Sequence, residues 1–237
     1  WCIVRLGVAG LVSGFDIDTS FFTGNYPASA SVEGCYAPDN QLDNIEWIPL
    51  LENSVLSPDQ HHFFDCSAQK ITHIRINIFP DGGIARLRVY GRVVVENVDT
   101  SQQIDLIGLK NGGRIVAFSD AHFGHPNNLL NPDRGLNMGD GWETKRRRAP
   151  GFDWCIIALG QAGLVEKIEV DTEYFRGNFP AFCSIQATYI EDATDAQLIP
   201  QSMFWPFLLE QQPLTMDNIH EYLAEVIQHQ KVNYIRV

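Results

Sequence analysis

One segment of the chain occurs twice, and this duplication limits the folds that the chain can adopt. Residues 1–36 align without a gap on residues 154–189, and 18 of the 36 positions are identical. The identities include tryptophan, asparagine and proline, which are rarely matched by chance. A second stretch, 56–62, matches 214–220 in the same order. Two copies of one structural unit therefore follow each other along the chain.

The local sequence pattern within each copy is that of β-strands. In residues 72–78, isoleucines alternate with polar side chains, as a half-buried strand requires. Residues 81–83, Asp-Gly-Gly, tolerate a positive φ, and alternation resumes over 84–90, so we expect a β-hairpin here. The other strands expected from the pattern are 2–6, 15–19, 28–36, 93–95 and 114–120.

Short strands separated by glycine and proline predict an all-β fold with two tandem jelly-roll β-sandwich repeats. The first repeat is expected over 1–98, without its N-terminal part, and the second over 103–237, without its C-terminal hairpin. Helix is expected to be minor. Ser57 and Thr215 begin stretches typical of helix N-caps, and the apolar spacing in 219–227 predicts a short amphipathic helix.

The composition narrows the classes of partner and compartment. The formal charge of −12 would repel nucleic acid and an anionic membrane surface, so neither is expected as a partner. The sequence has no apolar run long enough for a membrane span, and its first residues do not have the pattern of a signal peptide. Five scattered cysteines predict reduced thiols in a cytoplasmic protein, with the peroxisome as the second candidate compartment. No metal cofactor is predicted.

The densest group of polar residues lies at 118–130, where an expected strand passes into a loop. Asp120 and His122 are two residues apart and would point the same way on a continued strand, as an acid–base pair or as two metal ligands. The alternative is that Asp120 and the amides of Asn127 and Asn128 cap turns. A metal site has little support, because no third ligand has suitable spacing.

Four consecutive cations, Lys-Arg-Arg-Arg at 145–148, stand out in this acidic chain. On a strand, Glu143 and Arg147 would share one face, while Arg146 and Arg148 would share the other. Arginine binds a carboxylate with two parallel hydrogen bonds, so the segment is suited to anchor a small anionic substrate. A solvated basic strand and pairing with the protein's own carboxylates are the alternatives.

The duplicated loops 18–27 and 171–180 keep Asp, Thr and Asn in both copies, which supports a structural role and ligand contact about equally. Arg176 occurs only in the second copy. His62 and His220 occupy equivalent positions in the two copies, and this equivalence favours a structural role for both.

Three stretches together resemble the allantoicase family: 74–91, 119–155 and 153–180. Within them, the elements GDGWETKRRR and RGNFP, in this order, are specific to that family. The resemblance implies two jelly-roll repeats of the galactose-binding-like type and hydrolysis of allantoate to (S)-ureidoglycolate and urea. An allantoicase would also have an SD…DGWETRRR-like element before Trp1 and a PDGG hairpin after Val237, and neither is in this sequence.

The resemblance also implies a site for a small carboxylate whose central carbon holds two ureido groups. The expected substrate-binding residues are Arg146, Arg148, Arg176, Arg88 and Asn178. The expected catalytic residues, which would transfer protons to the departing nitrogen and from water, are Asp120, His122 and Glu143. A homo-oligomer is expected.

Two other functions are compatible with a jelly-roll fold. One is a non-catalytic galactose-binding-like module for a carbohydrate or another small ligand. The arginine run and the Asp120 and His122 group favour an enzyme over this alternative. The other is an inactive homologue.

Overall fold

The computed structural model describes residues 1–95, 102–227 and 231–237. The chain forms two compact units, Trp1–Val98 and Asp99–Val237. The predicted junction, between residues 98 and 103, falls mostly at residues 96–101, which lie outside the described residues. Among the described residues, no helix has the length and apolar character needed to cross a membrane.

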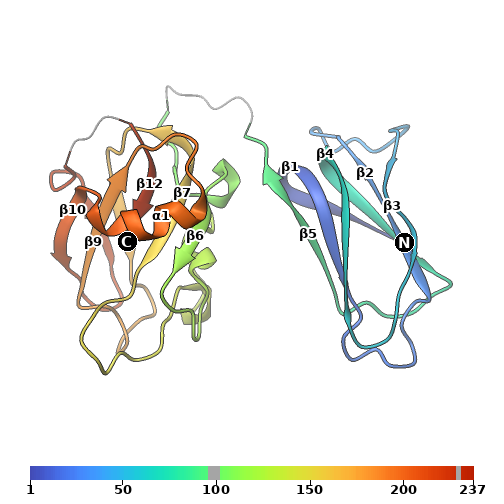
Figure 1. Ribbon diagram of the computed structural model, residues 1–237, viewed down its shortest axis with the longest axis horizontal. Helices are drawn as coiled ribbons and strands as arrows, with labels where there is room; N and C mark the ends of the chain where they lie inside the picture. The colour runs from blue at the N-terminus through green and yellow to red at the C-terminus, as the bar shows by residue number, and fades with distance from the viewer. Residues whose placement is uncertain (96–101, 228–230) are drawn as a thin grey trace. The chain divides into compact units, whose positions relative to one another are not determined.

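The first unit is a single antiparallel sheet that folds over its own core. Two long strands, β1 and β4, run through the unit (Figure 1). The sheet order is β3-β2-β4-β1-β5. Register shifts in β1 after Arg5 and after Val12 bend the sheet, so Phe15 of β1 and Val32 of β2 bury into the same core. The strands are β1 (Cys2–Asp18), β2 (Ser29–Cys35), β3 (Ile48–Val55), β4 (His61–Phe79) and β5 (Arg86–Val93).

The second unit repeats this plan with shorter strands. Its larger sheet has the order β10-β9-β12-β7-β6, and β11 pairs with β8 in a second sheet. By the sequence alignment, β7 and β8 correspond to β1, and β11 and β12 correspond to β4. The strands are β6 (Arg114–Phe118), β7 (Cys155–Gly163), β8 (Ile168–Asp171), β9 (Phe182–Thr188), β10 (Phe207–Pro213), β11 (Ile219–Tyr222) and β12 (Val232–Arg236). The predicted all-β fold of two tandem jelly-roll repeats is confirmed.

Helix is minor, as predicted, but it lies elsewhere in the sequence. The single α-helix among the described residues, α1 (Asp195–Gln201), begins with a capping box between Thr194 and Gln197 that the sequence analysis missed. The short 3-10 turns are η1 (Leu109–Asn111), η2 (Pro126–Leu130), η3 (Met138–Asp140) and η4 (Ser202–Phe204).

The five cysteines are free thiols, in agreement with the prediction. Burial raises the pKa of Cys155 to about 12 and that of Cys183 to about 11. Both thiols are therefore protonated and unreactive at neutral pH.

Three local predictions are wrong. The predicted strand 93–95 is absent, because β5 ends at Val93. The segments 72–78 and 84–90 do not form a hairpin, because β1 lies between β4 and β5 and pairs with both. The connecting loop does not turn tightly: the Gly83 amide donates to the Asn25 carbonyl at 2.7 Å, so the loop packs over the neighbouring turn. Strand β11 replaces the predicted helix over 219–227.

The turn before β11 explains the missing helix. Asp217, and Asp59 at the equivalent place in the first repeat, have φ values of 52° and 51°. A left-handed residue at this point interrupts the helical path that the N-cap pattern at Ser57 and Thr215 predicted.

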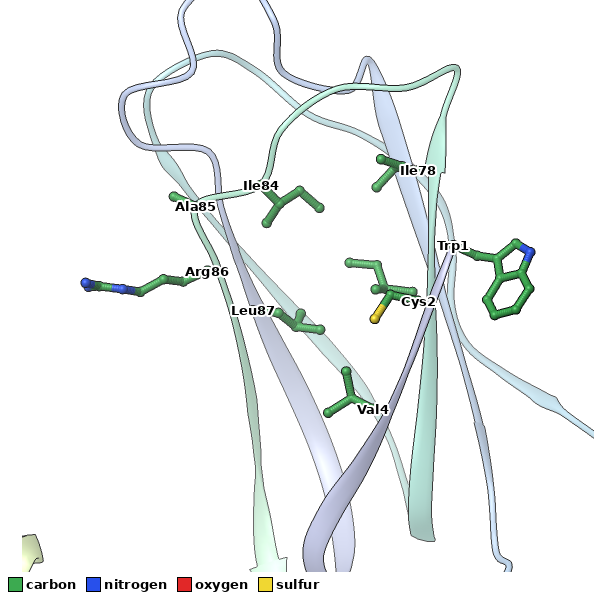
Figure 2. A pocket seen from close by; sticks show the side chains of 9 residues that line it. Trp1, Cys2, Val4, Ile78, Ile84, Ala85, Arg86 and Leu87 are labelled. Atoms are coloured by element: carbon green, nitrogen blue, oxygen red, sulfur yellow. The ribbon is translucent and has the colours of Figure 1, made fainter. Parts of the chain in front are cut away.

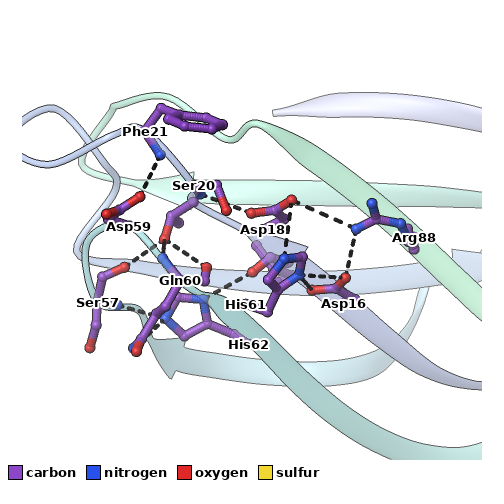
Figure 3. Close-up of polar contacts among 12 residues, drawn as sticks. Asp16, Asp18, Ser20, Phe21, Ser57, Asp59, Gln60, His61, His62 and Arg88 are labelled. Carbon is purple, nitrogen blue, oxygen red and sulfur yellow. Dashed lines mark hydrogen bonds and ion pairs between the residues drawn. The ribbon is translucent and has the colours of Figure 1, made fainter.

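The same hydrogen-bond network fixes this turn in both repeats, and Figure 3 shows it in the first repeat. The Thr19 hydroxyl donates to the Ser57 carbonyl at 2.7 Å, and the Thr172 hydroxyl donates to the Thr215 carbonyl at 2.7 Å. The ring of His62 accepts from the Ser57 amide at 2.8 Å, as the ring of His220 accepts from the Thr215 amide at 2.9 Å. These contacts support the structural role predicted for the two histidines.

Thr19 is fully buried, so its hydroxyl should contribute measurably to stability. We expect Thr19→Val to lower the free energy of unfolding by about 1–3 kcal/mol, because the partly buried carbonyl of Ser57 loses its hydrogen-bond donor. Thr19→Ser, which keeps the hydroxyl, is the control. Chemical denaturation measures both, and a loss below about 0.5 kcal/mol for the valine variant would contradict the assigned role.

Candidate active site

The candidate site is built on two loops of the second repeat, 119–125 and 141–153, which run beside each other. The Glu143 amide donates to the Gly124 carbonyl at 3.1 Å, and the Glu143 carbonyl accepts from the Gly124 amide at 3.2 Å. At the base, the Trp154 amide donates to the Ser119 hydroxyl at 3.0 Å. Backbone pairing therefore positions the polar side chains of both loops.

Asp120 holds the second loop in place rather than pairing with His122. Its carboxylate accepts from the Lys145 amide at 2.7 Å, and its carbonyl accepts from the Trp142 indole at 2.8 Å. Strand β6 ends at Phe118, so the strand geometry that would have aligned Asp120 with His122 is absent. The turn-stabilising alternative therefore describes Asp120 better than an acid–base pair does.

His122 is exposed, and its ring lies edge-on to Phe123 with the ring centres 4.4 Å apart. Asn128 has the structural role expected of a turn-capping amide, since its side chain donates to the Gly141 carbonyl at 2.9 Å. His125 accepts from the Asn127 amide at 3.1 Å. Two catalytic candidates, Asp120 and His122, lie in 118–130, and only His122 is exposed to solvent.

Glu143 and Asn178 come together from segments far apart in the sequence. The Asn178 side-chain amide donates to the Glu143 carboxylate at 2.5 Å. Asn178 belongs to the duplicated loop, whose counterpart residue in the first repeat is Asn25. The contact joins a residue predicted for catalysis to one predicted for substrate binding, although their proximity could not be seen in the sequence.

Of the four cations in the basic run, Lys145 forms an ion pair with Asp120 at 3.6 Å and Arg147 is also paired, whereas Arg146 and Arg148 are not. Segment 142–148 is not a strand, so the predicted alternation of faces is wrong. Arg147 forms an ion pair with Asp153. Arg146 and Arg148 are exposed, and within the described residues neither forms an ion pair.

Asp153 was missed by the sequence analysis, although it immediately precedes Trp154. Its carboxylate accepts from Arg147, from the Ser119 hydroxyl at 2.9 Å and from the Thr144 hydroxyl at 3.2 Å. Burial alone would raise the pKa of Asp153, but these hydrogen bonds outweigh it and lower the pKa. The hydrogen bond between Arg147 and Asp153 also raises the pKa of Arg147. Asp153 thus fixes the base of the loop that presents Arg146 and Arg148.

Arg176 and Arg88 are arginines with carboxylate partners of their own. The Arg176 Nε donates to Asp217 at 3.0 Å, but 76% of its side chain is exposed. Arg88 lies in the first repeat, where its Nη1 donates to Asp16 at 2.7 Å. The other predicted site residues belong to the second repeat.

An apolar pocket of about 390 Å³ opens on the first repeat beside Trp1 (Figure 2). Its lining includes Cys2, Val4 and Ile76, and Arg86 is its one charged residue and extends away from the apolar side chains. The equivalent positions in the second repeat contact the buried Leu130 and the half-buried Trp142. This apolar lining does not suit a polar substrate.

Among the described residues, no three His, Cys, Asp or Glu side chains are grouped so as to hold a metal ion.

The family model and the most similar relatives of this chain point to the same protein family. A model of the allantoicase repeat matches residues 1–94 and 104–237. A probable allantoicase of Acinetobacter baylyi is 68% identical over 238 residues, covering 100% of this chain and 71% of the relative. A probable allantoicase of Photobacterium profundum is 51% identical over 241 residues, covering 100% and 73%.

A solved structure agrees with the sequence matches. The crystal structure of allantoicase from Saccharomyces cerevisiae is 36% identical to the chain, with a TM-score of 0.83. The match covers 99% of this chain and 71% of the yeast protein chain.

The lowered pKa of Asp153 makes its contribution to stability depend on pH. An unperturbed aspartate has a pKa of about 3.9, so the contribution is present above that value and lost as the pH falls through the lower folded-state pKa. We expect Asp153→Asn to be less stable than wild type near neutral pH, with a difference that shrinks below about pH 4. Denaturation at stepped pH measures this, with Asp133→Asn as the control. A difference that stays constant down to pH 3 would refute the assignment.

Proposed function

The chain belongs to the allantoicase family, and we propose that it hydrolyses allantoate to (S)-ureidoglycolate and urea. The observation that supports this most strongly is the match of both repeats to the allantoicase repeat model. The alternative, a non-catalytic carbohydrate-binding or small-ligand module, is not favoured by this family assignment.

The reaction defines what the site must supply. Water forms a bond to the central carbon of allantoate while the bond from that carbon to one ureido nitrogen breaks. Water loses one proton and the departing nitrogen gains one, so urea leaves as a neutral molecule. The site needs a cationic anchor for the substrate carboxylate and at least one group that moves the proton.

Arg146 and Arg148 are the proposed anchor for the carboxylate. Both are exposed, and their neighbour Arg147 is already paired with Asp153. A guanidinium without an internal partner can give both of its parallel N–H groups to a substrate carboxylate. Arg176 and Arg88 are weaker candidates, because each already donates to an aspartate.

Glu143 is the best supported proton-transfer candidate in the second repeat. Its carboxylate is half-buried and oriented by Asn178, and an oriented carboxylate can accept a proton from water. Asn178, with its amide beside this carboxylate, would also contact the substrate. His122 is the second candidate, since its ring is exposed. Asp120 is the weakest, because its carboxylate binds the Lys145 amide.

Assembly and compartment are part of the same proposal. We propose a homo-oligomer, as the family resemblance implies, in the cytoplasm, with the peroxisome as the second candidate. The free cysteines support a reducing compartment.

The direct test is urea release from allantoate by the protein at the full length of its relatives. We expect turnover by the wild type, and a fall in kcat of about 10²-fold or more in Glu143→Gln, because the amide cannot accept a proton. Glu210→Gln, an exposed change on β10, is the control. His122→Ala is measured in parallel. If neither Glu143→Gln nor His122→Ala lowers turnover tenfold, the proposed catalytic residues are wrong.

The anchor is tested separately, through KM. Loss of a charge-assisted hydrogen-bond pair costs about 1.5–3 kcal/mol, so we expect Arg148→Ala or Arg146→Ala to raise KM about 10- to 100-fold. Arg148→Lys keeps the charge but not the paired donors, and we expect it to recover only part of the loss. Lys110→Ala, which removes an exposed cation elsewhere, is the control. An unchanged KM in both alanine variants would exclude these arginines as the anchor.

A further inference from the structure

Arg236, on the outer face of the larger sheet in the second repeat, is a buried cation. On β12, Ile235 packs into the main core of the unit, so the neighbouring Arg236 lies on the opposite face. A smaller apolar cluster covers this face, in which Leu198 of α1 and Trp205 pack against Ile156 of β7 (Figure 1). Arg236 is 7% exposed. The segment that begins with α1 therefore covers a charged side chain as well as apolar ones.

The guanidinium of Arg236 has hydrogen-bond and aromatic contacts but no ionic partner within the described residues. Its Nη1 donates to the Ser202 hydroxyl at 3.0 Å. The guanidinium carbon lies 5.0 Å from the ring centre of Trp154 and 5.8 Å from that of Phe152. Burial lowers the pKa of Arg236, but an arginine keeps its charge at neutral pH. An enclosed charge without a counter-charge is costly, and aromatic rings do not neutralise it.

The equivalent arginine of the first repeat does have a carboxylate partner. By the alignment of the repeats, Arg75 corresponds to Arg236. Its strand partner Glu33 corresponds to Gln186, the strand partner of Arg236. The Arg75 Nε donates to the Glu33 carboxylate at 2.8 Å, and the Asn77 amide donates to the same oxygen at 3.0 Å. The fold of one repeat therefore has a place for a carboxylate beside this arginine.

In the second repeat, the described residues supply no acid at this place. The side-chain amide of Gln186 donates elsewhere, to the carbonyls of Met203 at 3.2 Å and Trp205 at 2.7 Å. The Trp205 indole N–H is enclosed and has no acceptor. Its backbone amide donates to the carbonyl of Ser202, the residue whose hydroxyl binds Arg236, at 3.4 Å. The same cluster thus holds a guanidinium without an anionic acceptor and an indole without any acceptor.

The remaining N–H groups of Arg236 keep contact with solvent. The enclosed side-chain nitrogens and oxygens without a hydrogen-bond partner, among the described residues, are Trp205 Nε1 and Tyr222 Oη, and no nitrogen of Arg236 is one of them. Phe152, one of the two rings over the guanidinium, is itself 71% exposed. The small exposed fraction of Arg236 limits a ligand at this place to a small molecule.

We propose that Arg236 anchors a small monocarboxylate on the outer face of the second repeat, in the place that the Glu33 side chain fills in the first. A carboxylate suits this place, because two parallel N–H groups of a guanidinium bind its two oxygens. A single cation neutralises a single negative charge, which favours a monocarboxylate over a phosphate dianion. Allantoate and ureidoglycolate belong to this class of ligand, but binding of a carboxylate here does not depend on the proposed reaction.

Acetate is the probe, and the protein is made at the full length of its relatives. Nuclear magnetic resonance follows the indole N–H signals of Trp154 and Trp205, which are assigned by their loss in Trp154→Phe and Trp205→Phe. Sodium acetate replaces sodium chloride at constant ionic strength, so that screening by salt stays the same. We expect a saturable shift of at least one of these signals.

The dissociation constant of acetate identifies the anchor. We expect Arg236→Met to raise this constant about 10- to 100-fold, because a charge-assisted pair of hydrogen bonds is lost. Lys110→Met, which removes an exposed cation of the same unit, is the control and should leave the constant unchanged.

A second variant supplies the carboxylate from the protein itself, and it tests the proposal even if Arg236→Met does not fold. In Gln186→Glu, we expect the new side chain to pair with Arg236, as Glu33 pairs with Arg75, and to weaken acetate binding about tenfold or more. Gln211→Glu adds the same charge at an exposed position on β10. It is the matched control and should leave acetate binding unchanged.

Three results would each overturn the proposal. The first is the absence of a saturable shift with acetate. The second is an unchanged dissociation constant in a folded Arg236→Met variant, which would place acetate elsewhere on the protein. The third is undiminished acetate binding in Gln186→Glu. None of these measurements depends on urea release, so they leave allantoate hydrolysis to its own test.

Discussion

The hydroxyl group of one buried threonine in each repeat holds the turn on which the rest of the unit is arranged. Thr19 and Thr172 each donate to one side of the turn, and their backbone amides bond to its other side at 2.9 Å. This turn sets where β4, or its counterpart β11, begins and how it pairs with the preceding strand. The register of that pairing in turn decides which side chains enter the core and which face outward.

Equivalent positions of the same backbone fold carry different side chains in the two repeats. In the first, the outward positions of β1 and β4 hold Asp16 and His61. In the second, they hold Glu169 and Ile219, and an arginine from a distant loop binds the acidic side chains. The turn keeps Leu56, Asp59 and His62 as Leu214, Asp217 and His220, and its hydrogen bonds are the same in both repeats.

Much of the fold could be predicted from the sequence, because the repeat and the period-two alternation both depend on local spacing. The arrangement of β4 and β5 could not be predicted, because β1, a strand from much earlier in the chain, lies between them in the sheet. The helix predicted after Thr215 failed for a related reason. Its apolar spacing is compatible with a helix, but the turn network and the positive φ of Asp217 favour a strand.

The candidate site was predicted in part. Its residue types were visible in the sequence, but their partners were not: Asp153 binding Arg147, Asn178 binding Glu143, and the Lys145 amide binding Asp120. The last two contacts join segments whose proximity depends on the tertiary fold, and the first depends on the path of the 141–153 loop.

The central claim is that Arg146 or Arg148 binds the carboxylate of allantoate. A crystal structure of the Glu143→Gln variant, at the full length of its relatives and with allantoate bound, tests it most directly. The account predicts the substrate carboxylate within hydrogen-bond distance of Arg146 or Arg148. Allantoate bound instead to the duplicated turn at Thr19 and Thr172, or in the apolar pocket beside Trp1, would contradict it.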